Sequence, residues 1–258
     1  VPHAVNSNIF YPLPDEEIRK MKEEQFGEED NRVTFFWNNR NARRKLSGSV
    51  LIWFSEFAEK VGPENVRLIM HTDPRDPHGQ DLEKIIAAMG LDDGRILLST
   101  KKVKPSVLAA MYNMADCTVN ISDAEGFGLA TLESLSCQTP IIVNMTGGLQ
   151  EQVTDGESWF GIGIEPSSKA IIGSQQVPFI YEDRISKEDF HTALEKIYNM
   201  TPAERKLLGM KGRNHVIKNY NFEKFENQWI KLMDGIVEKH GSWKTRKGYQ
   251  AWAFKEIS

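Results

Sequence analysis

Two acidic residues, Glu125 and Glu133, stand eight positions apart on either side of a glycine–phenylalanine–glycine turn. An apolar run precedes the turn and a stretch of helix length follows it. Glycine lets a backbone come close to a ligand, and the free N–H groups at the start of a helix favour a diphosphate. A carboxylate one to two turns into that helix can accept hydrogen bonds from both hydroxyls of a ribose. The glycine turn at the start of a helix indicates a diphosphate site; the alternative is that both glutamates are solvated residues on a helix face.

A basic loop supplies the opposite charge. It begins at residue 38 and reads NNRNARRK, with Arg40 and Lys45 five positions apart and Arg43 and Arg44 as additional cations. A guanidinium fork and a compact ammonium suit a diphosphate leaving group, because both stabilise the charge that develops as the bond breaks. A solvated loop without a ligand is the alternative.

The charged segments lie in a sequence where short apolar runs alternate with amphipathic stretches of helix length. This alternation predicts βαβ units and therefore a parallel sheet with helices on both faces, an α/β doubly wound Rossmann-like layer with further helices appended at its C-terminal end. Ligands of such sheets bind outside the carboxyl ends of the strands, and both charged segments follow predicted strands. The predicted strands are residues 33–37, 66–70, 95–99, 117–121 and 140–144.

Outside the region of alternating strands and helices, the sequence predicts a short charged helix at 15–26 and three helices at about 187–199, 202–219 and 222–239. Thr201 is the expected N-cap of the second of these three, with Pro202 in its first turn. Residues 161–183 break the pattern, and we expect a long loop there, either a functional flap or a poorly ordered segment.

The charged segments together resemble family 4, group 1, of the retaining glycosyltransferases. The signature of that family is a Glu, a Gly-Phe-Gly turn, a second Glu and a Gly-Thr-Pro-like stop, which Gln138-Thr139-Pro140 fills here. Family members also carry an Arg after the first strand and a Lys five residues later. The Gly that usually precedes this Arg is Asn39 in this sequence. Weaker matches are Gly147, Gly148 and Glu151 after the fifth strand, and Tyr112, Ala115 and Asp116, expected to be core and helix-end structure.

The resemblance implies one half of a GT-B fold that binds a UDP- or GDP-sugar, with transfer that retains the sugar configuration and uses no metal or other cofactor. It implies that Glu125 orients the transferred sugar, that Arg40 and Lys45 hold the phosphates and that Glu133 holds the ribose. A non-catalytic sugar-nucleotide module, a same-fold epimerase and a phosphorylase are the alternatives. The remaining residues expected on the donor are Gly126, Phe127, Gly128, Leu129, Lys101 and Val103.

The same resemblance predicts a division of the chain into a linker with a short helix (1–30), a nucleotide-sugar-binding domain (31–240) and a C-terminal segment (241–258). The opening at Val1, followed closely by prolines, favours a segment cut from behind an N-terminal acceptor-binding domain. The aromatic and basic residues from Trp243 to Phe254 are expected to dock on that domain, with attachment to a membrane surface as the alternative. The acceptor is then a glycan or a lipid-linked molecule.

The composition excludes several further classes of protein. The 258 residues carry a formal net charge of −4, which argues against a nucleic-acid partner. No apolar run approaches the roughly 18 residues of a membrane span. Two cysteines are too few for a disulfide framework and favour a cytoplasmic location, peripheral to a membrane if the acceptor is lipid-linked. His71 and His78 bracket a loop rich in proline and aspartate, which is expected to be a surface loop rather than a metal site.

Overall fold

The computed structural model of the chain describes residues 1–173 and 175–247. Its centre is a sheet of six strands, all parallel, in the order β3-β2-β1-β4-β5-β6. This order and the helices on both faces confirm the predicted α/β doubly wound sheet. The strands are β1 (Val33–Asn38), β2 (Val66–His71), β3 (Ile96–Ser99), β4 (Cys117–Asn120), β5 (Ile141–Asn144) and β6 (Gly161–Ile164).

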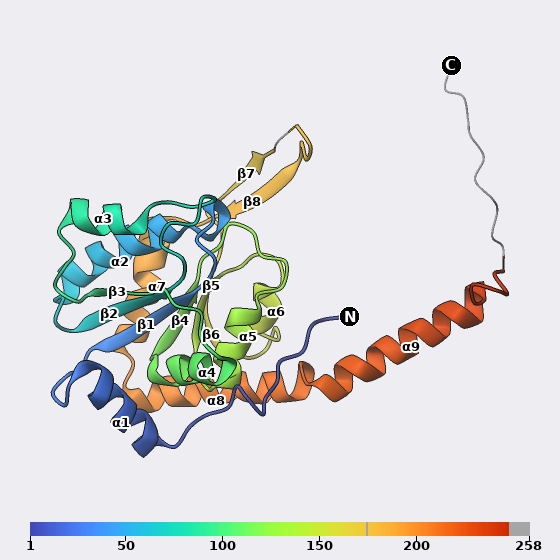
Figure 1. The fold of residues 1–258 in the computed structure, drawn as a ribbon, viewed down its shortest axis with the longest axis horizontal. Coiled ribbons are helices and arrows are strands. Elements are labelled where there is room, and N and C mark those ends of the chain that lie inside the picture. The colour runs from blue at the N-terminus through green and yellow to red at the C-terminus, as the bar shows by residue number, and fades with distance from the viewer. Residues whose placement is uncertain (174, 248–258) are drawn as a thin grey trace.

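Successive residues of each strand point to opposite faces of the sheet, and the core divides accordingly. Phe35 and Trp37 of β1 belong to one apolar cluster, with α2 (Ser47–Val61), α3 (Leu82–Met89) and α7 (Lys187–Asn199). Phe36 belongs to the cluster on the other face, which the remaining packed helices cover (Figure 1). Those helices are α4 (Pro105–Met114), α5 (Leu129–Ser136), α6 (Leu149–Val153) and α8 (Pro202–Asn219).

Helix boundaries follow local signals in the sequence. Pro105 begins α4, where its missing N–H leaves no hydrogen bond unmade. Thr201 and Glu204 form a capping box before α8, so the predicted N-cap and the first-turn Pro202 are confirmed. α1 (Asp15–Phe26) and α9 (Phe222–His240) also match their predicted ranges closely.

The segment 161–183 differs from the expected loop. Its first residues form β6, which pairs with β5 and completes the sheet. The rest contributes β7 (Ser168–Ile172) and β8 (Ile180–Arg184), an antiparallel hairpin that extends away from the body of the molecule (Figure 1). The expectation of a long loop was therefore wrong for most of this segment, because the glycines of β6 and the surface position of the hairpin hide a strand pattern.

The two ends of the described chain lie differently against the body. Residues 1–14 pack onto it: Val5 N donates to Tyr220 O at 2.9 Å, and Phe10 is buried. α9 has no buried residue and projects away from the sheet (Figure 1). Trp243 is 80% exposed beyond it. The rest of the aromatic and basic tail, from residue 248, lies outside the described residues.

Candidate functional site

The two charged segments meet at the centre of the sheet. β1 and β4 are neighbours, and the order of the strands reverses between them. Ligands of such sheets bind outside the carboxyl ends of the strands at this point. The loop after β1 and the loop after β4 are joined directly, since Asp123 N donates to Arg44 O at 2.8 Å. The segments predicted to bind phosphate and sugar therefore form one edge of the molecule.

Lys45 and Glu125 form the charged centre of this edge. Lys45 is buried, and its ammonium donates to the Glu125 carboxylate. Burial lowers the pKa of Lys45, and the contact with Glu125 opposes that shift. Arg44 lies beside the pair: it donates to Ala124 O at 2.6 Å and stands 3.7 Å from the same carboxylate. The structure thus brings two cations and one predicted sugar-binding acid together.

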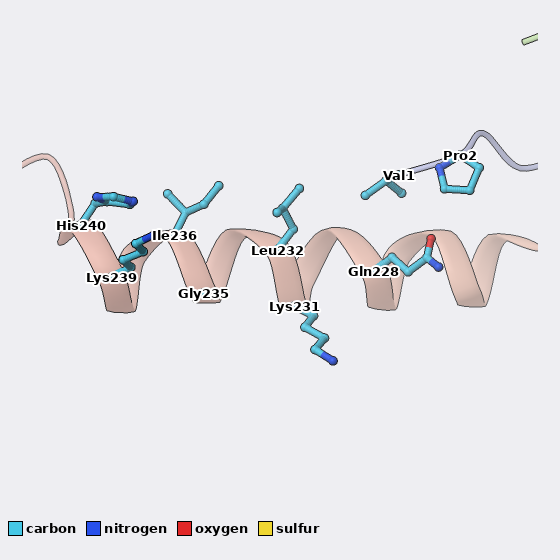
Figure 2. Close-up of a pocket in the computed structure, with 9 residues that line it drawn as sticks. All are labelled: Val1, Pro2, Gln228, Lys231, Leu232, Gly235, Ile236, Lys239 and His240. Atoms are coloured by element: carbon cyan, nitrogen blue, oxygen red, sulfur yellow. The ribbon is translucent and has the colours of Figure 1, made fainter. Parts of the chain in front are cut away.

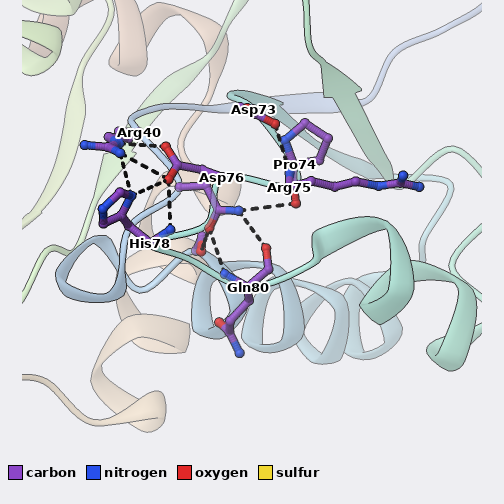
Figure 3. A network of polar contacts seen from close by, with 9 residues as sticks. Arg40, Asp73, Pro74, Arg75, Asp76, His78 and Gln80 are labelled. Atoms are coloured by element: carbon purple, nitrogen blue, oxygen red, sulfur yellow. Dashed lines mark hydrogen bonds and ion pairs between the residues drawn. The ribbon is translucent and has the colours of Figure 1, made fainter.

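Arg40 lies in a different network. Its guanidinium donates to Asp76 at 2.6 Å and contacts His78 Nδ1 at 2.7 Å (Figure 3). The side chain of Arg40 is 60% exposed, whereas that of Asp76 is 12% exposed. The hydrogen bond from Arg40 holds the pKa of Asp76 well below its usual range. The structure therefore places Arg44, rather than Arg40, beside Lys45.

The glycine turn is shaped by its neighbours. Gly128 is the N-cap of α5 and has φ +91°, a conformation that favours glycine. Gly147, at φ +50°, lies against Glu125: a Cβ there would stand 1.7 Å from Glu125 O. A Cβ on Gly126 would meet no atom within 4 Å, so the backbone of the turn is open to solvent at this position. Phe127 is half-buried, and Leu129 at the first position of α5 is exposed.

Glu133 lies on α5 in a second polar cluster. Tyr112 Oη donates to Glu133 at 3.0 Å and accepts from Asn38 at 2.8 Å. Burial raises the pKa of Glu133 to about 7, and the bond from Tyr112 opposes the shift. The sequence predicted Tyr112 only as a core residue. Its contact with Glu133 was missed because the two residues are far apart in the sequence and lie on different helices.

The loop after β3 lies on the same edge, two strand positions from β1. Neighbouring strands are about 4.8 Å apart, so this separation is on the order of 10 Å. Lys101 is exposed and Val103 is half-buried. Between this loop and β1, two buried polar atoms, Asn39 Nδ2 and Thr72 Oγ1, have no hydrogen-bond partner within the part of the chain that the structure describes. Unsatisfied buried groups are unfavourable.

The hairpin is anchored to the same site. Arg43, the remaining cation of the basic loop, forms a two-pronged ion pair with Glu182 of β8, which is 1% exposed. Asp183 N donates to Asp123 O at 2.8 Å. Burial raises the pKa of Asp123 to about 6, with Glu182 as a further cause. Sequence reasoning missed Glu182, because it lies in the segment predicted to be a loop.

Other features of the structure do not belong to these charged clusters. In residues 1–173 and 175–247, no cluster of His, Cys, Asp or Glu is arranged to hold a metal ion. His71 contacts Ser99 at 2.9 Å, apart from the His78 network. None of the described helices is both long and apolar enough to traverse a bilayer. An open groove runs along α9 below Val1 and Pro2, with Leu232 and Ile236 pointing toward it (Figure 2).

Comparisons with known proteins agree with this architecture. The sequence pattern of the family described as "Glycosyl transferases group 1" matches residues 64–215. A mannosylfructose-phosphate synthase of Agrobacterium fabrum is 26% identical over 218 residues, which cover 81% of this chain and 46% of that relative. A D-inositol 3-phosphate glycosyltransferase of Arthrobacter sp. is 31% identical over 113 residues, which cover 44% of this chain and 26% of that relative. The chain thus spans less than half the length of these two curated relatives.

Solved structures show the same fold. A sucrose-phosphate synthase from Thermosynechococcus elongatus aligns with a TM-score of 0.69 and 22% identity over 93% of this chain and 52% of its own. Anabaena HepE in complex with UDP-glucose aligns with a TM-score of 0.68 and 14% identity over 90% of this chain and 56% of its own. The C-terminal domain of a group 1 glycosyl transferase (LpcC) from Francisella tularensis is matched over 99% of its length, with a TM-score of 0.61, 19% identity and 84% of this chain covered.

Fold and site define a Rossmann-like α/β unit that corresponds to the C-terminal half of a GT-B protein. Because the family pattern covers more than half of the residues, the chain belongs to the group 1 glycosyl transferases.

Proposed function

We propose that this chain is the donor-binding half of a retaining, metal-independent glycosyltransferase that uses a UDP- or GDP-sugar. The observation that carries the proposal is the convergence of Lys45 and Arg44 on Glu125 at the switch point of the sheet, beside the turn that begins α5. Cations and a helix N-terminus at one point favour a diphosphate. HepE, which shares the fold, has been solved with UDP-glucose.

In this proposal the diphosphate lies between Lys45, Arg44 and the backbone of residues 126–129. Glu133 accepts hydrogen bonds from the ribose, and the base extends toward Lys101 and Val103 after β3. The transferred hexose then lies in front of Glu125. The bond between its anomeric carbon and the phosphate oxygen breaks, and the acceptor oxygen bonds to that carbon on the same face. The acceptor proton passes to the departing diphosphate, whose charge the two cations stabilise.

The isolated chain is proposed to bind donor without transferring sugar at a useful rate. Positioning of two substrates supplies much of the rate of a transfer reaction, and the matched relatives are at least twice as long as the aligned part of this chain. The exposed apolar side chains of α9, among them Ile230 and Met233, suit packing against the other half of a longer parent. Rapid transfer to any acceptor by this chain alone would refute this part of the proposal.

Calorimetry of the chain with UDP, GDP and their sugars, in the presence of EDTA, tests the donor site. Micromolar to millimolar binding of at least one nucleoside diphosphate without metal is the expected result. If binding requires added magnesium or manganese, the metal-independent site is wrong. If no nucleotide binds under either condition, the donor-binding role fails as a whole.

A further inference from the structure

The hydroxyl of Tyr112 stands between two polar side chains of the candidate site. It contacts Glu133 at 3.0 Å and the amide nitrogen of Asn38 at 2.8 Å. The Asn38 nitrogen can only donate, so the hydroxyl oxygen of Tyr112 accepts that bond. A phenol has a single proton, which is therefore directed at Glu133. The three residues form a hydrogen-bond chain with one direction, from β1 through α4 to α5.

The tyrosine ring has little freedom to move. It is fully buried, with the ring of Phe36 edge-on at 5.2 Å and that of Phe10 at 6.1 Å between centroids. The backbone oxygen of Tyr112 accepts from Thr139 Oγ1 at 2.7 Å, which ties this end of α4 to the start of β5. A hydroxyl held in this way fixes the carboxylate that it contacts.

We infer that Tyr112, oriented by Asn38, is a positioning residue that turns the Glu133 carboxylate toward a ribose diol. This inference rests on the proposed donor site and deepens it. An ionised carboxylate offers about four lone-pair directions, and Tyr112 occupies one of them. The others remain for the two ribose hydroxyls. Tyr112 thus acts on ribose through Glu133 and does not itself touch the nucleotide.

This role predicts the direction in which the pKa of Glu133 changes when the Tyr112 hydroxyl is removed. Burial raises the pKa of Glu133 to about 7, and the hydrogen bond from Tyr112 lowers it. The titratable groups that face Glu133 are Tyr112 of α4 and Cys137 at the end of α5, both neutral near pH 7 because burial raises their pKa. Arg213 of α8, packed on α5 from another side, donates to Ser136 O instead. Removal of the Tyr112 hydroxyl therefore shifts Glu133 toward its protonated form.

The decisive variant is Tyr112→Phe, with Asn38→Ala as the second variant and Tyr198→Phe as the control. Tyr198 packs on Phe57 on the opposite face of the sheet. At pH 7 we expect Tyr112→Phe to weaken UDP or GDP binding about fivefold to tenfold and to leave inorganic pyrophosphate unaffected. At pH 9, where Glu133 is ionised in either protein, most of this loss should disappear. Asn38→Ala should show a smaller loss with the same dependence on pH.

A loss that is equal at pH 7 and pH 9, or equal for pyrophosphate, would mean that Tyr112 only supports the fold and would overturn the inference. Carboxyl NMR titration of Glu133 in the unliganded chain provides an independent readout, in which Tyr112→Phe raises the pKa of Glu133. If neither nucleotide binds the wild-type chain, the proposed function fails. An unchanged pKa in Tyr112→Phe refutes the positioning role whether or not nucleotide binds.

Discussion

The Lys45 ammonium contacts the Glu125 carboxylate although the two residues are 80 positions apart in the sequence. Both side chains are about 90% buried, so neither charge is well solvated. A buried ion pair is weak evidence of stabilisation, because desolvation offsets much of its attraction. Its position at the switch point of the sheet favours a binding role instead. An incoming diphosphate would compete for Lys45 and turn Glu125 toward the sugar.

Lys45→Ala should therefore weaken binding of UDP or GDP by about 1.5–3 kcal/mol, the usual contribution of a charge-assisted hydrogen bond. Binding of the bare nucleoside should change little. Calorimetry with the diphosphate and the nucleoside measures both effects. Lys60→Ala is the matched control, because Lys60 pairs with Glu195 on an exposed surface. Equal losses for nucleoside and diphosphate would assign Lys45 to folding.

Arg44→Ala should lower diphosphate affinity more than Arg40→Ala does. Arg44 already lies beside Glu125, whereas Arg40 must first leave Asp76 and His78. The motif spacing alone predicts the opposite order, with Arg40 as the phosphate ligand. Side-by-side titrations of the two variants decide between them. Asp76→Ala provides a further check: if it tightens binding only when Arg40 is present, Arg40 does reach the phosphates.

Glu133→Gln should stabilise the unliganded chain at neutral and alkaline pH. The pKa of Glu133 is raised from 4.5 to about 7 on folding, so the folded state holds this proton more tightly than the unfolded state. Wild-type stability from this group is therefore lost as the pH rises from about 4.5 to about 7, and the loss is constant above that range. The variant avoids the loss, and at pH 8 we expect its unfolding free energy to exceed that of wild type by roughly 3 kcal/mol.

Urea unfolding of both proteins at pH 4.5 and pH 8 measures this difference, which should nearly vanish at the lower pH. Other groups titrate alike in the two proteins, so the comparison isolates Glu133. A difference that is equal at both pH values would contradict the assignment. A buried acid that lowers stability is consistent with retention for ligand binding.

Arg43→Ala should loosen the hairpin and destabilise the chain by about 1–2 kcal/mol, because it leaves the buried Glu182 without its two-pronged partner. Hydrogen exchange should increase in β7 and β8 more than in the sheet. Arg75→Ala is the control, since Arg75 pairs with Glu83 on the surface. Unchanged exchange in the hairpin would show that backbone bonds such as Asp183 N to Asp123 O suffice to hold it.

The sequence predicted the first five strands and the helices that follow them, because the apolar periodicity agrees there with the proline and glycine residues that end each element. It did not reveal β6, because Gly161 and Gly163 weaken any strand signal. Glycine is required at both positions because other segments of the chain pack against them. A Cβ on Gly161 would stand 2.1 Å from Ile141 O, and one on Gly163 would stand 2.6 Å from Met145 Sδ. Close approach of two chain segments cannot be inferred from one segment alone.

At the candidate site, the meeting of the two charged loops was predictable from the sequence. Strand topology brings the loops after β1 and β4 together, so the meeting of Lys45 with Glu125 follows from the order of elements. The choice between Arg40 and Arg44 does not, because it depends on how the loop holding Asp76 folds. The contact of Tyr112 with Glu133 likewise depends on how α4 and α5 pack.

The two glutamates of the motif should separate in a kinetic experiment on a longer parent that transfers sugar. Glu133 lies on α5, where we propose that it holds the ribose in ground state and transition state alike. Its loss removes uniform binding, so Glu133→Ala should raise KM more than it lowers kcat. Glu125 precedes the helix, and its contacts to the sugar should strengthen as the bond breaks. Glu125→Gln should therefore mainly lower kcat.

Binding of the bare nucleoside diphosphate separates the two roles a second time. Glu125→Gln should keep this affinity within about threefold, under 1 kcal/mol, because the leaving group does not include the sugar that Glu125 faces. Glu133→Ala should lose it together with the ribose contact. Glu188→Gln is the matched control, an exposed acid in the first turn of α7. The opposite pattern, with nucleotide affinity dependent on Glu125 and kcat on Glu133, would show that the roles are reversed.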